Sequence, residues 1–174
     1  MISPIAFLSD SGFVYNVAYR MMGNPHDAEE VAQDAFVSAY KARDRFRGDA
    51  QPTTWLYRIT VHAALMRIRK DKRGKEMTVS EDARPDIASS NWAESPVAAT
   101  MNSELGARID AAINKLPEDL RVAVILRDVQ GLSNQEAADT LEVSVSALKA
   151  RLHRGRIQLR DSLEQYVAQR AKAD

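Results

Sequence analysis

The stretch from Ser144 to Arg160 has the sharpest charge pattern of this 174-residue chain: five Lys and Arg residues and no carboxylate. Basic side chains on one helix face can neutralise DNA phosphates and reach base edges in the major groove. A basic face that is only solvated would show a similar pattern. The flanking residues are therefore needed to distinguish a solvated face from a DNA-binding one. The residues that we predict to contact duplex DNA are Ser144, Ser146, Ala147, Lys149, Ala150, Arg151, His153 and Arg154.

The residues just before this stretch predict a helix-turn-helix. Ser133 and Glu136 have the spacing of a capping box, in which the serine caps the helix and the glutamate bonds back to it. That helix should end near Leu141, and Ser144 can cap a longer helix after a turn of about three residues. Two helices joined in this way form the motif whose second helix enters the major groove.

A second basic cluster lies between residues 46 and 75, where aromatic residues alternate with Arg and Lys. From Thr54 onward, seven basic residues stand against one carboxylate, Asp71. Basic side chains hold phosphates while aromatic faces can stack on unpaired bases, a combination typical of single-strand binding. Spacing alone leaves open whether Phe46 and Trp55 are exposed for stacking or packed in a core.

The chain has no net charge, yet its charges are unevenly distributed. Residues 1–75 hold twelve Lys and Arg against eight Asp and Glu, residues 76–96 hold one against five, and residues 97–174 hold eleven of each. The chain therefore has a basic first part, an acidic connector and a last part with balanced charge. The zero net charge therefore does not argue against nucleic-acid binding.

Catalytic and metal-binding patterns are missing from the sequence. Cysteine is absent, and the three histidines, His26, His62 and His153, are scattered without H-E-x-x-H spacing. No apolar run approaches the roughly 20 residues of a membrane span. We therefore expect a cytoplasmic protein that is not an enzyme, with no cofactor, no catalytic or metal site and no membrane insertion.

Helical periodicity runs through most of the chain and strand signals are few, which predicts an all-α fold. We expect helices from about Pro4 to Met22, from a cap at Asn24 to about Arg45, and from about Thr54 to Asp71. The expected buried stripes are Ala28, Val31, Ala35 and Ala39 in the second helix and Leu56, Ile59, Ala63 and Met66 in the third.

The periodicity is lost over residues 72–95, where Ser, Asp, Glu, Ala and Pro gather, and this predicts a flexible linker. We expect two small helical domains, residues 1–73 and 96–174, joined by an acidic linker at residues 74–95. Pro96 should begin a helix and Pro117 should open another that runs to about Val129. The stripe expected in the first of these helices is Val97, Met101, Leu105, Ile109 and Ile113.

Several of these segments together resemble a known family, the extracytoplasmic-function (ECF) sigma factors of bacterial RNA polymerase. The segments that resemble region 2 of the family are residues 27–36 (DAEEVAQDAF), 46–49 (FRGD) and 54–59 (TWLYRI), and those that resemble region 4 are residues 116–118, 131–141 and 149–154. The resemblance covers both predicted domains in the right order. It implies a sigma factor that binds core RNA polymerase and directs promoter-specific initiation.

The resemblance also implies roles for individual residues. Asp27, Glu30, Gln33 and Asp34 should bind the polymerase β′ clamp, region 4 should meet the β flap, and the helix-turn-helix should read the minus-thirty-five element. The minus-ten element should be read as a single strand with a flipped base. The residues implied for it are Phe46, Arg47, Gly48, Asp49, Thr54, Trp55, Arg58, His62, Arg67 and Arg69. Promoter DNA and an anti-sigma factor are further expected partners.

Some positions depart from the family's usual residues. Glu142 stands in the helix-turn-helix turn where glycine is common, and a left-handed conformation there would cost about 1 kcal/mol. Ser146 and Ala147 replace a common Gly-Thr pair, while His62 and Met66 replace Asn or Asp. These departures bear on the promoter sequence rather than on the general role.

Two other functions fit parts of the sequence. The main alternative is a dimeric helix-turn-helix regulator with an N-terminal sensing domain, which would bind a palindromic site unaided. A sigma factor should instead need core polymerase for strong promoter binding. A pure interaction module, such as an anti-sigma protein, would not need a basic recognition helix.

Overall fold

The computed structural model describes residues 11–77 and 103–172, and every regular element in these ranges is helical. The first group comprises α2 (Ser11–Met22), α3 (Pro25–Ala42), the short 3-10 helix η1 (Arg43–Arg45) and α4 (Pro52–Met77). The second group comprises α5 (Ser103–Lys115), α6 (Glu118–Val124), the π-helical segment η3 (Ile125–Val129), α7 (Asn134–Leu141) and α8 (Val145–Ala171). The all-α prediction is confirmed. The predicted helix starts at Pro4 and Pro96, and the stripe residues Val97 and Met101, lie outside the described residues.

Local sequence sets the helix beginnings at the predicted caps. The Asn24 side chain accepts a hydrogen bond from the backbone N–H of Asp27 at 2.9 Å. The capping box of α7 is complete: Ser133 Oγ accepts from the Glu136 N–H at 3.1 Å, and Glu136 accepts from the Ser133 N–H at 2.8 Å. Ser144 caps α8 through its own side chain, which accepts from the Ala147 N–H at 3.1 Å. Each helix thereby gains partners for backbone N–H groups that its first turn leaves free.

Glu142 adopts the left-handed conformation in the turn between α7 and α8, with φ 56° and ψ 41°. It is the one residue other than glycine with a positive φ in the described ranges. Its N–H bonds back to the end of α7, so the strained geometry closes the helix and reverses the chain toward α8.

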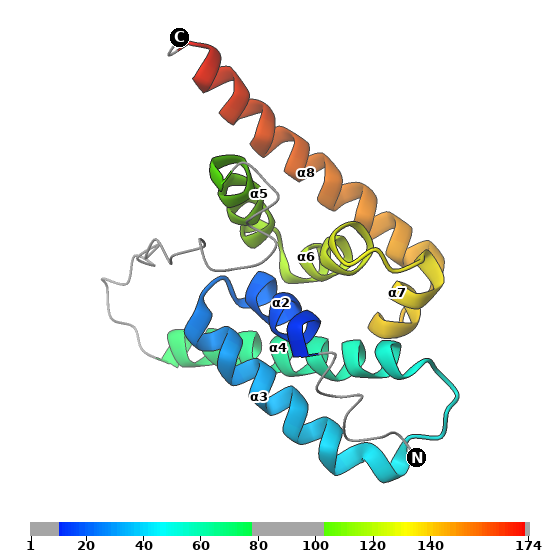
Figure 1. Cartoon of the computed structure of the whole chain (residues 1–174). Helices are drawn as coiled ribbons and strands as arrows, with labels where there is room; N and C mark the ends of the chain where they lie inside the picture. Colours follow the sequence, from blue (N-terminus) through cyan, green and yellow to red (C-terminus); the bar gives the residue numbers. More distant parts are fainter. Residues whose placement is uncertain (1–10, 78–102, 173–174) are drawn as a thin grey trace.

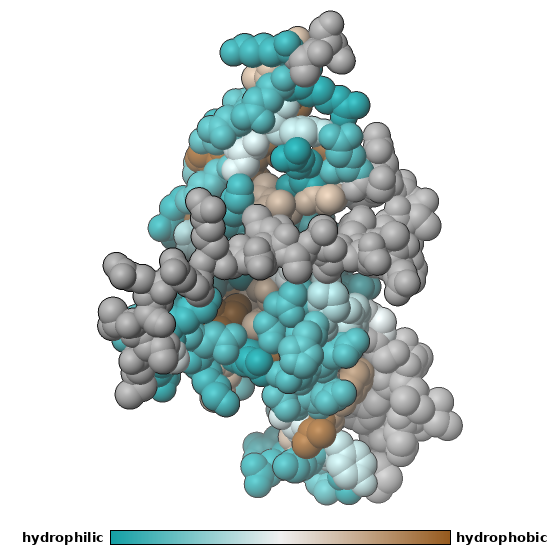
Figure 2. Space-filling model, turned by 90° about the vertical axis from the view of Figure 1, so that its left-hand side faces the viewer, coloured by the Kyte–Doolittle hydropathy of each residue, from teal (hydrophilic) through white to brown (hydrophobic). Residues whose placement is uncertain are grey.

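The two helix groups lie directly against each other (Figure 1). Helices α2, α3 and α4 pack together, and α5, α6 and α7 approach the same α2 and α4 from the other side. The long α8 crosses α6 closely at the buried Gly155, where an added Cβ would lie 2.9 Å from Val124 Cγ2. The side of the molecule in Figure 2 is mainly hydrophilic where it is not grey, with hydrophobic residues only in small separate areas.

One hydrophobic cluster runs through both groups. It includes Val17 and Met21 of α2, Val61 of α4, Ile125 after α6 and Leu148 of α8, all at most 3% exposed. A smaller cluster lies between α2, α3 and the start of α4. The predicted stripe of α3, from Ala28 to Ala39, is buried as expected. The parts that the sequence suggests as separate domains thus share a core in this structure.

Two residues predicted to be buried are exposed, and this part of the prediction is wrong. Met66 is 56% exposed and Leu105 is 42% exposed. Met66 follows the buried Ala64 by two residues, which places it about 200° around the helix from that residue. The strict four-residue spacing of the α5 stripe drifts around the helix, so that the buried Gly106, rather than Leu105, lies under Ile113.

We expect Glu142→Gly to stabilise the protein by about 1 kcal/mol, because glycine adopts the left-handed conformation without a Cβ clash. Urea unfolding followed by circular dichroism measures this change. The matched control is Glu164→Gly, which places the same substitution inside α8 and should destabilise by a similar amount. A lower stability of Glu142→Gly than of the unmodified protein would contradict this account.

Candidate nucleic-acid interface

The first turns of α8 present the predicted duplex-binding residues to solvent. Ser144, Ser146, Lys149, Ala150, His153 and Arg154 are exposed, and Ala147 and Arg151 are half-buried. Leu148 and Leu152, on the opposite side of the helix, are buried in the core. The buried leucines fix the rotation of α8, so the polar residues point outward as one face.

The cationic character of this face ends after Arg154. Within the described ranges, Lys149, His153 and Arg154 form no ion pair. Arg156, one turn or less further on, binds Asp128 with two hydrogen bonds of 2.6 and 2.9 Å, and this contact raises the pKa of Arg156. Because Arg156 is held by a carboxylate, the unpaired positive charge is concentrated at the N-terminal part of α8.

The loop before α4 and the first turn of that helix contain several of the residues implied for the minus-ten strand. Gly48 has a φ of 79°, and Thr54 is buried. The rings of Phe46 and Trp55 contact each other with centroids 5.1 Å apart, and Trp55 also packs against the smaller core cluster. Both rings are half-buried, so each is partly packed in the protein and partly exposed for stacking.

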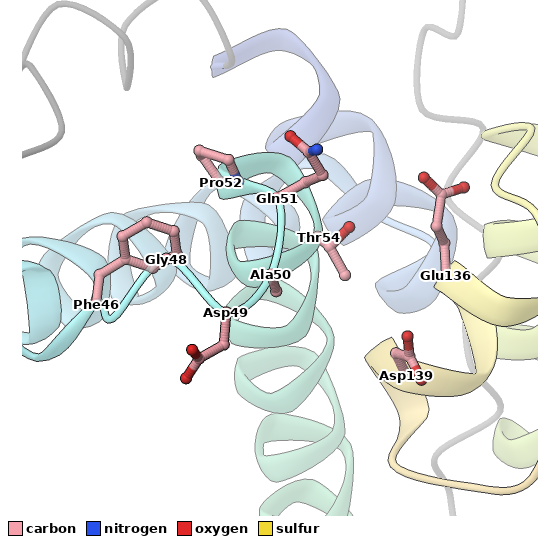
Figure 3. A pocket seen from close by; sticks show the side chains of 9 residues that line it. All are labelled: Phe46, Gly48, Asp49, Ala50, Gln51, Pro52, Thr54, Glu136 and Asp139. Carbon is pink, nitrogen blue, oxygen red and sulfur yellow. The ribbon is translucent and has the colours of Figure 1, made fainter.

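A groove of about 440 Å³ separates this loop from α7 (Figure 3). Asp49, Gln51 and Thr54 line one side, and Glu136 and Asp139 line the other. Hydrogen bonds from the Ser133 backbone and side chain lower the pKa of Glu136, so its carboxylate is charged at neutral pH. The groove is therefore acidic on its α7 side.

The predicted basic residues of α4 have different surroundings. His62 and Arg69 are exposed, as is Arg47 in the loop. Arg58 is half-buried and donates a hydrogen bond to the backbone carbonyl of Asp139 in α7 at 2.8 Å. The structure therefore brings a residue implied for the minus-ten strand against the helix-turn-helix.

Arg67 lies among three carboxylates rather than in solvent. Its guanidinium pairs with Asp27 at 3.1 Å, with Asp71 at 3.3 Å and with Glu30. The hydrogen bond to Glu30 raises the pKa of Arg67. His26 also approaches Glu30, at 3.3 Å, but the Asp27 and Glu30 oxygens that a metal ion would need already have Arg67 as a counter-ion. The arrangement ties α3 to α4.

The exposed face of α3 contains Gln33 and Asp34, two of the residues implied for the β′ clamp. The other two, Asp27 and Glu30, are half-buried beside Arg67. Val37 and Tyr40 share the exposed face and are 51% and 61% exposed. Neither residue was predicted to bind a partner, although both fall outside the buried stripe of α3 at positions where a solvated face would be polar.

A set of polar contacts between the two helix groups was not predicted either. Arg20 of α2 pairs with Asp110 of α5 at 2.7 Å, and Tyr57 of α4 donates to Gln130 at 3.2 Å. Arg121 donates to the Met21 carbonyl at 2.7 Å. Burial raises the pKa of Asp110 although Arg20 opposes the shift, and burial lowers the pKa of Arg121. No local pattern links residues this far apart in the chain.

Comparisons with known proteins identify the family of the chain. Residues 7–74 match the family model of sigma-70 region 2, and residues 106–159 match that of sigma-70 region 4. The ECF RNA polymerase sigma factor SigE of Mycolicibacterium smegmatis is 37% identical over 92% of this chain, which spans 61% of that protein. The ECF RNA polymerase sigma factor SigW of Bacillus subtilis is 34% identical over 86% of this chain and 82% of its own length.

Two solved structures have a similar fold. CnrH, in complex with the cytosolic domain of CnrY, has a TM-score of 0.64 and 26% identity over 92% of this chain and 86% of its own. The sigma factor RpoE of Bartonella quintana, in complex with the anti-sigma factor NepR, has a TM-score of 0.71 and 22% identity over 91% of this chain and 94% of its own. Both sigma-70 regions are thus present in chain order. The chain belongs to the ECF sigma factors of the sigma-70 family. Among the described residues, no helix is both long enough and apolar enough to span a membrane.

We expect Arg67→Ala to lower the free energy of unfolding by about 1–2 kcal/mol, because half-buried Asp27 and Glu30 lose their shared cation. Urea unfolding measures the change, and 1 M salt should reduce it by screening the remaining carboxylates. The matched control is Arg69→Ala on the same helix, which forms no ion pair in the described ranges and should be nearly neutral. Equal effects of the two substitutions would refute a structural role for Arg67.

Proposed function

We propose that this protein binds core RNA polymerase in the cytoplasm and directs promoter-specific transcription initiation, without catalytic activity of its own. In this proposal region 2 reads the minus-ten element as a single strand and helix α8 reads the minus-thirty-five element as duplex. The observation that carries the proposal is the exposed cationic face at the start of α8, on a capped helix-turn-helix in an ECF chain. The structural neighbour RpoE, solved with the anti-sigma factor NepR, supports a partner of that kind here.

Run-off transcription on a promoter library with purified core polymerase tests the function directly. Specific initiation should occur only when this protein is added. The dimeric regulator, the alternative from the sequence, predicts instead that the protein binds a palindromic site tightly without polymerase. The same preparations therefore separate the two functions. Failure to support initiation from any library member would refute the sigma-factor proposal.

Lys149 and Arg154 are the best candidates for base contacts, because both are exposed without an ion-pair partner among the described residues. We expect Lys149→Ala or Arg154→Ala to weaken recognition of the minus-thirty-five element by about 1–3 kcal/mol if the side chain contacts a base. Holoenzyme binding to promoter variants measures this. Arg160→Ala, further along α8 and beside Asp161 and Glu164, is the matched control and should change binding little. Unchanged promoter preference in both test variants would count against the assignment.

The exposed face of α3 has the composition of a protein-binding surface. Val37 and Tyr40 place apolar area between polar residues, and Arg43 stacks over the Tyr40 ring at 4.0 Å. Tyrosine and arginine are frequent among residues that dominate interface energies. Gln33 and Asp34 on the same face can supply polar contacts to a basic partner. We assign this face to the β′ clamp, with Val37 and Tyr40 as its apolar centre.

We expect Asp34→Lys and Tyr40→Ala each to reduce affinity for core polymerase, by about tenfold or more, while circular dichroism stays unchanged. Titration of core polymerase with labelled protein measures the affinity. Glu164→Lys is the matched control, because it makes the same charge reversal at an exposed residue of α8 instead of α3. Normal core affinity in both test variants would place the polymerase contact elsewhere.

A further inference from the structure

One face of α4 stays in solvent along about three turns of the helix. The side chains on it are exposed and recur at spacings of three and four residues: His62, Met66, Arg69 and Arg73. The opposite face, which includes Thr60 and Ala64, is completely buried. We call the four exposed residues the open face of α4. Because the core holds the opposite side of the helix, these residues point outward together.

The C-terminal part of the open face is cationic. Arg69 and Arg73 form no ion pair within the part of the chain that the structure describes. Before Glu76, α4 contains one carboxylate, Asp71, and that carboxylate is bound to Arg67 at 3.3 Å on another side of the helix. Cations without carboxylate neighbours suit the phosphates of a nucleic-acid strand. The open face therefore matches a strand that runs along α4.

Met66 lies on the open face between two residues that are proposed to bind the minus-ten strand. It is 56% exposed, whereas its neighbours Leu65 and Ile68 pack against the large core cluster. Single exposed apolar residues are common on protein surfaces, so exposure alone indicates no function. The position of Met66 does, because it lies one turn after His62 and one turn before Arg69. A strand that contacts both of these residues has to cross Met66.

The side chain of Met66 limits what it can recognise on such a strand. An asparagine or an arginine distinguishes bases by hydrogen bonds to their edges. Methionine has no donor, its thioether accepts only weakly, and the rest of its side chain is flexible and apolar. It can therefore favour a base only through an apolar group on that base. Thymine presents such a group, the C5 methyl, which cytosine lacks.

We propose that Met66 is a specificity-determining residue, which selects thymine at one position of the non-template minus-ten strand through contact with the C5 methyl group. Arg69 and Arg73 hold the phosphates beside that base and add affinity without a base preference. The assignment rests on the proposed sigma-factor function and adds one base, and the atom by which it is recognised, to that function.

The first test is run-off transcription with core polymerase on promoters whose minus-ten positions are randomised. The unmodified protein is compared with Met66→Asn, which makes the side chain polar, and with Met66→Leu, which keeps it apolar. We expect Met66→Asn to remove a thymine preference of about threefold or more at one position, and Met66→Leu to retain it. Arg69→Ala is the matched control on the same face, and it should lower transcription from all promoters without changing the preference.

The second test removes the methyl group from the DNA instead of the side chain from the protein. Deoxyuridine replaces thymidine at the position found in the first test, in a fluorescent non-template strand that is titrated with holoenzyme. The replacement keeps every hydrogen-bonding group of the base. We expect the unmodified holoenzyme to bind the uracil strand about fourfold more weakly, the effect of one buried methyl group. Holoenzyme with Met66→Asn should bind both strands equally.

Three results would overturn the role of Met66 and leave the proposed function intact. The first is an unchanged base preference in Met66→Asn, and the second is an equal loss of transcription from all promoters, which would indicate a contact with the DNA backbone or with polymerase. The third is a methyl effect that is absent from the unmodified protein or persists in Met66→Asn. Failure of the unmodified protein to direct initiation would instead refute the proposed function.

Discussion

Helix α4 is packed from two sides, and the arrangement of the other helices depends on this packing. Helices α2 and α3 cover one side of it, and α7 lies against another near its start. The same packing joins the clusters of both groups into one apolar core, with Tyr57, Val61 and Ala64 of α4 among its residues. Burial of apolar area is the largest favourable contribution to folding, so the position of α4 decides which of its charged residues stay in solvent. Its arginines acquire their different surroundings from this arrangement.

The sequence predicts features that depend on residues a few positions apart. The caps at Asn24, Ser133 and Ser144 follow from such local spacing and are confirmed, whereas the left-handed Glu142, also observed, was suggested by the family resemblance. The stripes through Met66 and Leu105 are wrong because their spacing does not follow the helical period: Met66 lies far around α4 from the buried Ala64, and the four-residue steps of the α5 stripe drift away from its buried face. For the candidate interface, the exposure of the α8 face could be predicted from the helical period. The ion pairs of Arg67 with Asp27 and of Arg20 with Asp110 could not, because their partners are 40 and 90 residues away and no local sequence pattern indicates them.

Arginine residues show why a charge pattern alone does not define a binding surface. Arg154 and Arg156 are two positions apart in a stretch without carboxylates, yet Arg156 is held by Asp128 and Arg154 has no ion pair in the described ranges. Arg67 balances carboxylates of α3 and α4. A guanidinium has a fixed planar fork that suits carboxylates and phosphates equally, so the fold decides which of the two it binds.

The ion pair between Arg20 of α2 and Asp110 of α5 fixes how the two helix groups meet more than it stabilises their contact. Arg20 and Asp110 are largely buried, and removing two charges from water costs much of the energy that their attraction returns. The raised pKa of Asp110 shows that burial outweighs the attraction of Arg20, so the ionised carboxylate is less favourable here than in water. Apolar residues of similar volume in place of this pair would bury the same area without this cost. Removal of either partner would leave the other charge buried and unpaired, which costs more than the intact pair contributes.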